Sequence, residues 1–209
     1  MCEVKTRNSV KLATRYGEGT LHSFHNLCDG KEHVALSFGN IEDMDVVPVR
    51  VHSECLTGEV FGSAKCDCGE QLDEALAKFS KTGGILIYMR QEGRGIGLYN
   101  KIDAYGLQNG GMDTVEANRA LDFEDDLRDF QAAAEILNAL GVQKISLLTN
   151  NPRKHAQMQG YGIEVVRRMP TSLFVKAENR LYLLVKALKS GHLLDKKSLS
   201  TAVALPKSA

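Results

Sequence analysis

The chain has 209 residues, of which 43% are hydrophobic and 25% charged, and its 26 basic and 26 acidic side chains give a formal net charge of zero. This length suits one domain with a sizeable core. The lack of a basic excess argues against sequence-independent nucleic-acid binding, and no apolar run approaches the roughly 20 residues of a membrane-spanning helix. Because the first eleven residues are polar rather than a secretory signal, we expect a cytoplasmic protein with neither nucleic acid nor membrane as partner.

Short runs rich in Val, Ile and Leu, bounded by Gly, Asp or Asn, predict five strands. In chain order they cover residues 33–38, 46–51, 84–89, 144–148 and 163–167. Helical periodicity predicts helices over 70–79 and 126–140, and Asp113 to Glu116 matches a capping box that opens another. The alternation indicates an α/β (α+β) fold, a mixed β-sheet with flanking helices. We expect a single catalytic domain over 1–195 and a flexible C-terminal tail over 196–209.

Three of the five cysteines, Cys55, Cys66 and Cys68, fall within a short stretch of charged and polar residues. In a compartment that keeps thiols reduced, such spacing favours metal binding over disulfides, and Cys2 and Cys28 are expected to take no part. A closed four-cysteine zinc site usually shows two Cys-x-x-Cys pairs, and this chain has neither. The spacing therefore predicts a catalytic zinc with three protein ligands and one position for water, whose pKa the metal lowers.

Other interpretations of this segment stay open at this stage. The cysteines can be buried as small hydrophobic residues, or His52 can complete a closed structural site as the fourth ligand. His52 and Glu54 also match the His-x-Glu of zinc nucleoside deaminases, although the Pro-Cys-x-x-Cys of that signature is missing.

Two loops that follow predicted strands are candidates for binding an anionic small molecule. Residues 90–97 are rich in glycine, which lets a backbone approach a ligand closely, but they match neither the Rossmann nor the Walker pattern. In this loop the Glu92 carboxylate can accept two N–H groups of a guanine edge, and Arg94 can fork onto phosphate. Residues 148–154 place two amides and two cations where open α/β sheets bind ligands. Basic side chains near these loops are expected to contact phosphate: Arg90, Arg94, Lys101, Arg128, Arg153 and Lys154.

Arg128 lies in what is predicted to be the first turn of the helix over 126–140. A cation there opposes the helix dipole, whereas the neighbouring aspartates suit it. This placement suggests that Arg128 serves an anionic ligand.

Six motifs occur in a fixed order and together resemble the GTP cyclohydrolase II family over roughly residues 33–194. They are RVHSECLTGEVFGSAKCDCGEQL, YMRQEGRGIGLYNKIDAYGLQ, DTVEAN, DLRDF, LLTNNPRK and GHLL. The resemblance implies a GTP cyclohydrolase II-like fold and a hydrolase that opens the imidazole ring of GTP at C8. Formate and pyrophosphate are released, and 2,5-diamino-6-hydroxy-4-(5-phosphoribosylamino)pyrimidine is formed, as the first step of riboflavin biosynthesis. The resemblance also implies one catalytic Zn²⁺ per subunit, Mg²⁺ with the GTP phosphates, and a homodimer.

The same resemblance assigns roles to individual residues. Cys55, Cys66 and Cys68 match the zinc ligands, Asp126 a proton acceptor, Tyr105 a residue that completes formate loss, and Arg128 a nucleophile in pyrophosphate release. Since a guanidinium stays protonated, charge stabilisation by Arg128 is chemically more reasonable than nucleophilic attack. The positions matching GTP contacts are Arg50, Val51, His52, Ser53, Glu54, Gln71, Glu92, Gly93, Arg94, Thr114, Thr149 and Lys154.

Three alternative functions remain at this stage. One is a homologue that stops at the formylated intermediate, which the presence of Tyr105 disfavours. The others are a zinc nucleotide deaminase and a module that binds GTP without turnover. Because no domain precedes the matched region, we do not expect a bifunctional arrangement with dihydroxybutanone phosphate synthase.

Overall fold

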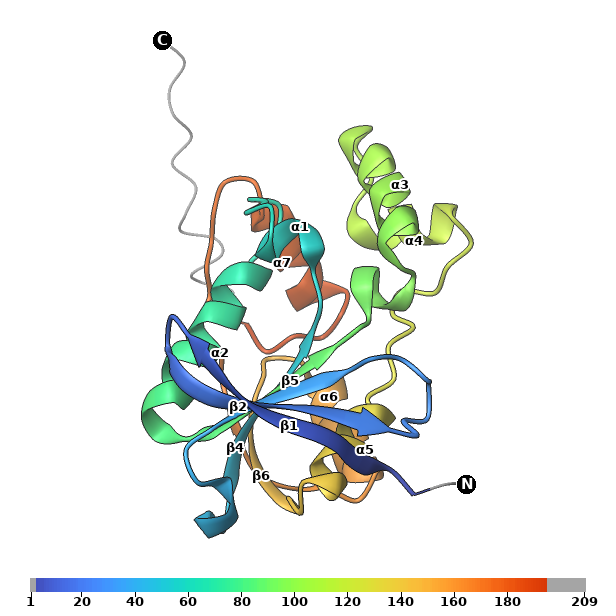
Figure 1. The fold of residues 1–209 in the computed structure, drawn as a ribbon. Helices are drawn as coiled ribbons and strands as arrows, with labels where there is room; N and C mark the ends of the chain where they lie inside the picture. The colour runs from blue at the N-terminus through green and yellow to red at the C-terminus, as the bar shows by residue number, and fades with distance from the viewer. Residues whose placement is uncertain (1–2, 195–209) are drawn as a thin grey trace.

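Seven strands form one mixed sheet within residues 3–194, the part of the chain that the computed structural model describes (Figure 1). Their order across the sheet is β1-β2-β3-β5-β4-β6-β7. Strands β1, β2, β3 and β5 pair antiparallel, whereas β4 pairs parallel with β5 and β6, and β6 pairs parallel with β7. The bounds are β1 Lys5–Thr14, β2 Gly17–His25, β3 Val34–Phe38, β4 Val47–Ser53, β5 Gly84–Met89, β6 Lys144–Leu148 and β7 Glu164–Met169. The expected α/β class with a mixed sheet is confirmed.

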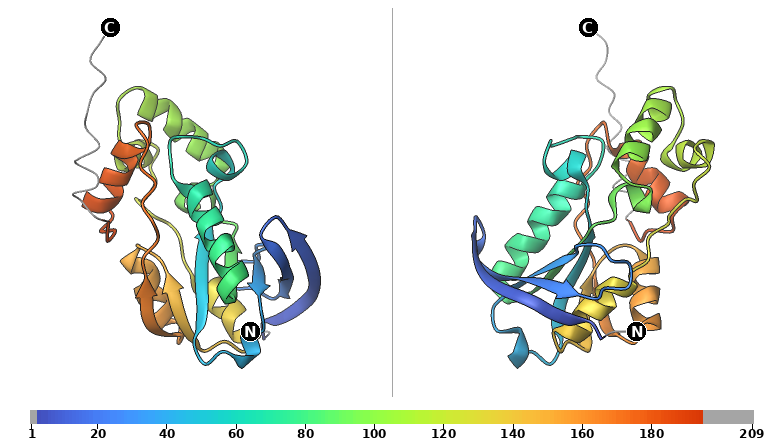
Figure 2. Two further views of the ribbon diagram at one scale, coloured as in Figure 1. Left: turned by 90° about the vertical axis from the view of Figure 1, so that its left-hand side faces the viewer. Right: turned by 45° about the vertical axis from the view of Figure 1, so that its right-hand side comes forward.

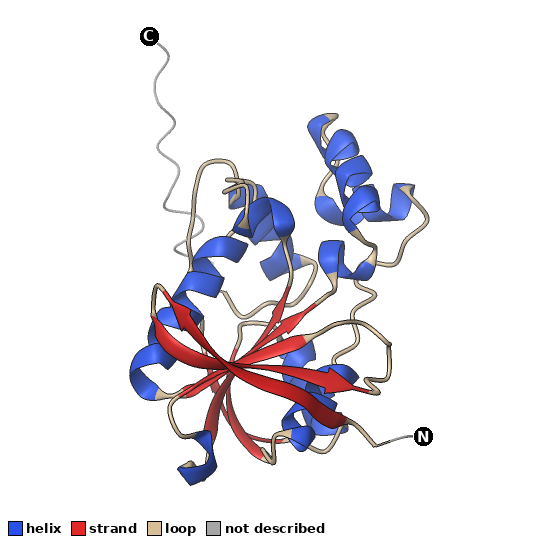
Figure 3. Cartoon of the chain, in the orientation of Figure 1, coloured by secondary structure: helices blue, strands red, loops and turns tan. Residues whose placement is uncertain are grey.

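Helices cover both faces of this sheet, as the views in Figures 2 and 3 show. Helix α2 (Cys68–Thr82) buries Ala75 and Phe79 in one core together with Leu86 of β5. Helices α5 (Gln131–Ala139) and α6 (Pro152–Gly160) pack against the opposite face, where Ile85 and Ile87 of β5 point. Both faces of β5 are therefore buried, which explains its unbroken apolar sequence.

The five predicted strands are confirmed to within two residues at their ends. The hairpin β1–β2 is absent from the sequence prediction, because nine of the ten β1 residues are exposed and carry no alternating apolar signal. The strand lies at the edge of the sheet, where pairing with β2 alone determines its conformation.

The helix predictions are partly right. The capping box opens α4 (Thr114–Ala120) as expected, with the Asp113 side chain accepting from the N–H groups of Val115 and Glu116. The helix predicted over 126–140 is wrong at its start, since α5 begins only at Gln131 and residues 126–130 form a loop. The remaining helical elements are η1 (Ile41–Asp43), α1 (Leu56–Glu59), η2 (Glu92–Gly95), α3 (Leu98–Asn109) and α7 (Arg180–Leu188).

Helices α1, α3, α4 and α7 gather beyond the carboxyl ends of β4 and β5 (Figure 1). Parallel strands deliver the residues that follow them to the same edge of a sheet, so this is where ligands bind in open α/β folds. Within residues 3–194 no helix has the length and apolar character needed to cross a membrane. The tail expected over 196–209 lies outside the described residues, and the domain limits remain a prediction.

Candidate active site

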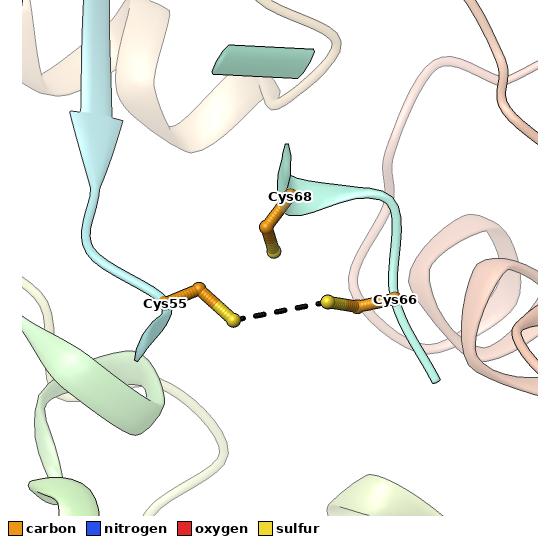
Figure 4. Close-up of side chains that lie close together, drawn as sticks. All are labelled: Cys55, Cys66 and Cys68. Atoms are coloured by element: carbon orange, nitrogen blue, oxygen red, sulfur yellow. Dashed lines mark hydrogen bonds between the residues drawn. The ribbon is translucent and has the colours of Figure 1, made fainter. Parts of the chain in front are cut away.

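The three clustered cysteines converge from two elements at this edge of the sheet (Figure 4). Cys55 lies two residues after the end of β4 and immediately before α1, Cys66 lies in the loop before α2, and Cys68 is the first residue of that helix. Their sulfur atoms all lie within 4.8 Å of one another, and those of Cys55 and Cys66 are 3.7 Å apart. Tetrahedral zinc with Zn–S bonds of about 2.3 Å requires sulfurs about 3.8 Å apart. The spacing of the three sulfur atoms therefore fits a zinc ion.

No fourth His, Cys, Asp or Glu joins the three sulfurs in the part of the chain described here. The alternative with His52 as fourth ligand is wrong, because His52 is not part of the group around the sulfurs, and its buried ring places Nε2 2.8 Å from Glu59 Oε1. The Gly58 backbone lies so close to the cysteines that an added Cβ would meet Cys66 Sγ at 2.7 Å. A set of three protein ligands is that of a catalytic zinc site rather than a structural one.

Lys101, from α3, contacts the sulfur of Cys55. Its Nζ lies 3.1 Å from Cys55 Sγ, 3.0 Å from Thr57 Oγ1 and 2.7 Å from Glu92 Oε1. Hydrogen bonds from Cys66 and Cys68, together with the charge of Lys101, lower the pKa of the Cys55 thiol. Lys101 was expected among the phosphate contacts; in the structure its ammonium contacts Cys55 of the cysteine triad. Its sequence position 46 residues away gave no signal for this contact.

We expect Lys101→Met to weaken zinc binding about 10- to 100-fold, the usual effect of removing a group that supports a metal ligand. The reason is that the anionic Cys55 sulfur would lose its charged N–H donor. Competition with a chromophoric chelator measures this affinity without depending on turnover. Unchanged affinity in a folded Lys101→Met protein would show that the contact does not support the metal site.

Beside the cysteines lies a cleft with two compartments that share Ser53, Cys68, Arg94, Arg128 and Tyr182 along their common wall. The cysteine compartment has a mainly apolar lining that includes Ile96, Ala104 and Tyr105. The cationic compartment is lined by five cations and one carboxylate, namely Arg50, Arg94, Arg128, Lys154, Lys186 and Asp67. The shared wall makes the two compartments one continuous site.

Two buried cations of the cationic compartment have no carboxylate partner among the described residues. Arg50 donates to the Leu148 carbonyl at 3.0 Å and to Gln71 Oε1 at 2.5 Å, and its Nε is buried without a partner. Lys154 Nζ donates to the Val51 carbonyl at 2.6 Å, and burial together with Arg50 and Arg128 lowers the pKa of Lys154. Uncompensated buried charge is costly, so this compartment is built for an anion.

Arg128 and Asp126 form a two-pronged ion pair in the loop before α5. Arg128 Nε and Nη2 lie 2.8 Å and 2.7 Å from the two Asp126 oxygens, and Arg128 Nη1 reaches Ser53 Oγ at 3.4 Å. Although burial lowers the pKa of Arg128, its hydrogen bonds to Asp126 raise it above the ordinary value. The guanidinium is therefore a fixed positive charge on the wall between the two compartments. The loop conformation removes the helix-dipole argument for Arg128, whose role toward an anionic ligand stays a prediction.

Residues 5–170 match the family model described as GTP cyclohydrolase II. The chain belongs to the GTP cyclohydrolase II family. It is 54% identical over 194 residues to "GTP cyclohydrolase-2" of Psychromonas ingrahamii, covering 92% of this chain and 97% of that protein. The corresponding protein of Vibrio cholerae is 52% identical over 196 residues, with 93% and 99% covered.

Longer relatives also match the GTP cyclohydrolase II region. "Riboflavin biosynthesis protein RibBA" of Bacillus cereus strain AH187 is 57% identical over 196 residues, covering 92% of this chain and 49% of that protein, so the chain spans about half its length. Among solved structures, RibBX, a two-domain 3,4-dihydroxy-2-butanone 4-phosphate synthase from A. baumannii, overlaps with a TM-score of 0.47 and 21% identity, covering 83% of this chain and 41% of that one.

Most of the residues that the family resemblance identified line this cleft. The cysteine compartment is lined by Ser53, Glu54, Glu92, Gly93, Arg94, Tyr105 and Thr114, and the cationic compartment by Arg50, His52, Ser53, Gln71, Arg94, Thr149 and Lys154. Asp126 lies in an adjoining hollow with Arg94, Arg128 and Arg153. Val51 is the exception, since its side chain is in the core and only its carbonyl faces Lys154.

The Glu92 carboxylate, predicted to accept from a guanine edge, already has three partners in the structure. Its oxygens accept from Leu56 N at 2.7 Å, Gly93 N at 2.8 Å and Lys101 at 2.7 Å, and the side chain is 7% exposed. A carboxylate with these three partners fixes the loop around Cys55 and has little capacity left for a base. Glu92 therefore supports the cysteine site through its contacts with Leu56, Gly93 and Lys101.

Proposed function

We propose that this member of the GTP cyclohydrolase II family hydrolyses GTP in the two-compartment cleft, with the guanine beside the cysteines and the triphosphate in the cationic compartment. The imidazole ring opens at C8, formate and pyrophosphate leave, and the diamino-pyrimidine ribosyl phosphate that starts riboflavin biosynthesis remains. The observation that carries the proposal is the shared wall of Cys68 and Arg128, which joins a zinc-competent site to an anion site.

Each compartment supports one half of this reaction. Cys55, Cys66 and Cys68 would hold zinc, which when bound supplies a Lewis acid that activates water for attack on C8. Arg50, Lys154 and Gln71 would bind the phosphates, and Arg128 would stabilise charge at the α-phosphorus. Asp126 holds Arg128 in place and is the proposed proton acceptor, while Thr114, Thr149, Arg94 and the 92–94 backbone are the remaining proposed contacts.

Mg²⁺ and a homodimer complete the proposal. Mg²⁺ commonly binds through substrate phosphates and keeps several waters, so we expect it to enter with GTP rather than at a preformed protein cage. The dimer rests on family resemblance, and sedimentation of the purified protein tests it.

The decisive experiment incubates purified, zinc-loaded protein with GTP and Mg²⁺ and quantifies formate, pyrophosphate, ammonia and the nucleotide product by mass spectrometry. The proposal requires formate and pyrophosphate. Ammonia release would favour the deaminase alternative, against which His52 already counts because it pairs with Glu59. GTP that raises the melting temperature yet stays intact would identify a binding module.

Tyr105 is expected to act after ring opening. Its hydroxyl lies 3.2 Å from Thr57 Oγ1, and its ring lines the cysteine compartment. We expect Tyr105→Phe to keep pyrophosphate release but accumulate a product that retains the formyl group, because the hydroxyl needed for the second hydrolysis is gone. Mass analysis of the product distinguishes the two. Tyr99→Phe, on the exposed surface of the same helix, is the control and should give the complete product.

A further inference from the structure

The chain between β7 and residue 194 contributes to the lining of the cationic compartment, although the family model ends at residue 170. Its lining residues are Thr171, Tyr182, Leu183, Lys186, His192 and Leu194. Helix α7 packs against α4, and the segment after it is tied down where Leu193 N donates to the Asn150 carbonyl at 2.9 Å. Asn150 also holds the start of this segment through Thr171 Oγ1 at 2.8 Å. This C-terminal segment, residues 171–194, therefore forms part of the compartment wall.

Lys186 is the cation that this segment contributes. It is 9% exposed, its Nζ lies 3.0 Å from Asp67 Oδ1, and it sits over the Tyr182 ring at 4.2 Å from the centroid. An ammonium has three N–H donors, so the contact with Asp67 leaves donors for a ligand in the compartment that it lines. The other Asp67 oxygen accepts from Gln71 Nε2 at 2.5 Å, which connects Lys186 to the residue that also binds Arg50.

His192 is the second contribution of the segment. It lines the same compartment, and its backbone N–H donates to the Lys186 carbonyl at 3.0 Å. Burial and the charges of Lys186, Arg128, Arg94 and Lys154 lower the pKa of His192 to about 2, so four cations converge around a neutral imidazole. A neutral imidazole still offers one N–H donor to a phosphate oxygen.

The charge of the compartment calls for a ligand with several negative charges. Asp67 faces Lys186 and Asp126 faces Arg128, which leaves Arg50, Arg94 and Lys154 without a carboxylate partner among the described residues. The cations of the compartment come from β4, η2, α6 and α7. A chain of phosphates can contact more of them at once than a single phosphate can.

We propose that Lys186 and His192 bind the β- and γ-phosphates of the nucleotide, so that the C-terminal segment is a working part of the triphosphate site. This inference rests on the proposed function for the identity of the nucleotide. That the ligand is an anion is inferred from the cations that line the compartment. It predicts that this enzyme distinguishes a triphosphate from a monophosphate through residues that lie after the part of the chain matched by the family model.

The test measures binding of inorganic tripolyphosphate and of GMP to the full-length, zinc-loaded protein by calorimetry. We expect Lys186→Met to weaken tripolyphosphate binding at least about tenfold, the usual effect of losing a charged hydrogen bond, and GMP binding less than about threefold. Lys176→Met is the matched control, since Lys176 belongs to the same segment but pairs with Glu70 and lines neither compartment. It should bind both probes as the wild type does.

Two further variants keep the test decisive if Lys186→Met fails to fold with Asp67 unpaired. His192→Ala removes a donor without stranding a charge, and the double variant Asp67→Asn with Lys186→Met removes both members of the ion pair. Both should weaken tripolyphosphate binding selectively. Wild-type affinity in all folded variants, or an equal loss for GMP, would overturn the proposal. Since tripolyphosphate binding needs no turnover, it decides this point even if GTP yields no formate.

Discussion

Replacing Cys66 with serine is expected to remove zinc and to lower formate release from GTP at least about a thousandfold, since the activated water would lose its metal. A serine hydroxyl stays protonated near neutral pH and is a poor ligand for zinc, and two cysteines alone do not make the three-ligand set. The Cys66 sulfur is 3.7 Å from that of Cys55, so the substitution acts at the centre of the site. Zinc per chain by atomic absorption and formate by enzymatic assay are the two readouts.

Cys28→Ser is the matched control for this experiment. Cys28 is a free, exposed cysteine outside the triad, so its replacement should leave zinc content and formate release unchanged. Full ring opening by a Cys66→Ser protein shown to contain no zinc would contradict the metal's role and the function built on it.

The cysteine site was predictable because its signal is local. Cys66 and Cys68 are separated by one residue, and Cys55 lies four residues after the strand predicted over 46–51. The sequence therefore indicated both the type of ligand and where the strand before it ends. The same holds for the capping box at Asp113, where the side chains of Asp113 and Glu116 determine the start of α4. Features that depend on residues close together in the sequence are therefore predicted well.

Contacts made over long sequence distances were not predictable. Nothing near Lys101 in the sequence indicates that its ammonium contacts the Cys55 sulfur. The contacts of the Glu92 carboxylate with the Leu56 N–H and with Lys101 are likewise visible only in the folded structure. Lys186 likewise finds Asp67 across 119 residues. In each case tertiary packing, not residue type, assigns the role.

The start of α5 shows the competing interactions most clearly. Apolar periodicity extended the predicted helix back to residue 126, but the side chain of Asp126 binds Arg128 and that of Asp129 accepts from Gln131 N at 2.6 Å. Side chains that bind nearby backbone and neighbouring charges stabilise a loop at the expense of a helical turn. The outcome places the Arg128 guanidinium on the wall between the compartments.

Arg128→Gln is expected to lower pyrophosphate release about a hundredfold to a thousandfold, the typical effect of removing one preorganised group that stabilises transition-state charge. The side chain is 13% exposed and fixed by both Asp126 oxygens, so its charge is oriented before substrate arrives. Arg128→Lys should fall between wild type and Arg128→Gln, because an ammonium keeps the charge but loses the fork geometry. Arg119→Gln is the control, since Arg119 makes the same two-pronged pair with Asp125 yet is 67% exposed, and it should retain wild-type rates.

The same experiment separates charge stabilisation from nucleophilic attack by Arg128. A nucleophilic guanidinium would have to lose a proton. Burial lowers the pKa of Arg128, but the ion pair with Asp126 outweighs burial and raises that pKa above its ordinary value. We therefore expect acid-quenched wild-type protein to show no guanylyl adduct by intact mass during turnover, and the lysine variant to retain measurable pyrophosphate release. An adduct mapped to Arg128, together with equal loss in the lysine and glutamine variants, would establish covalent catalysis and assign Asp126 the task of deprotonating its partner.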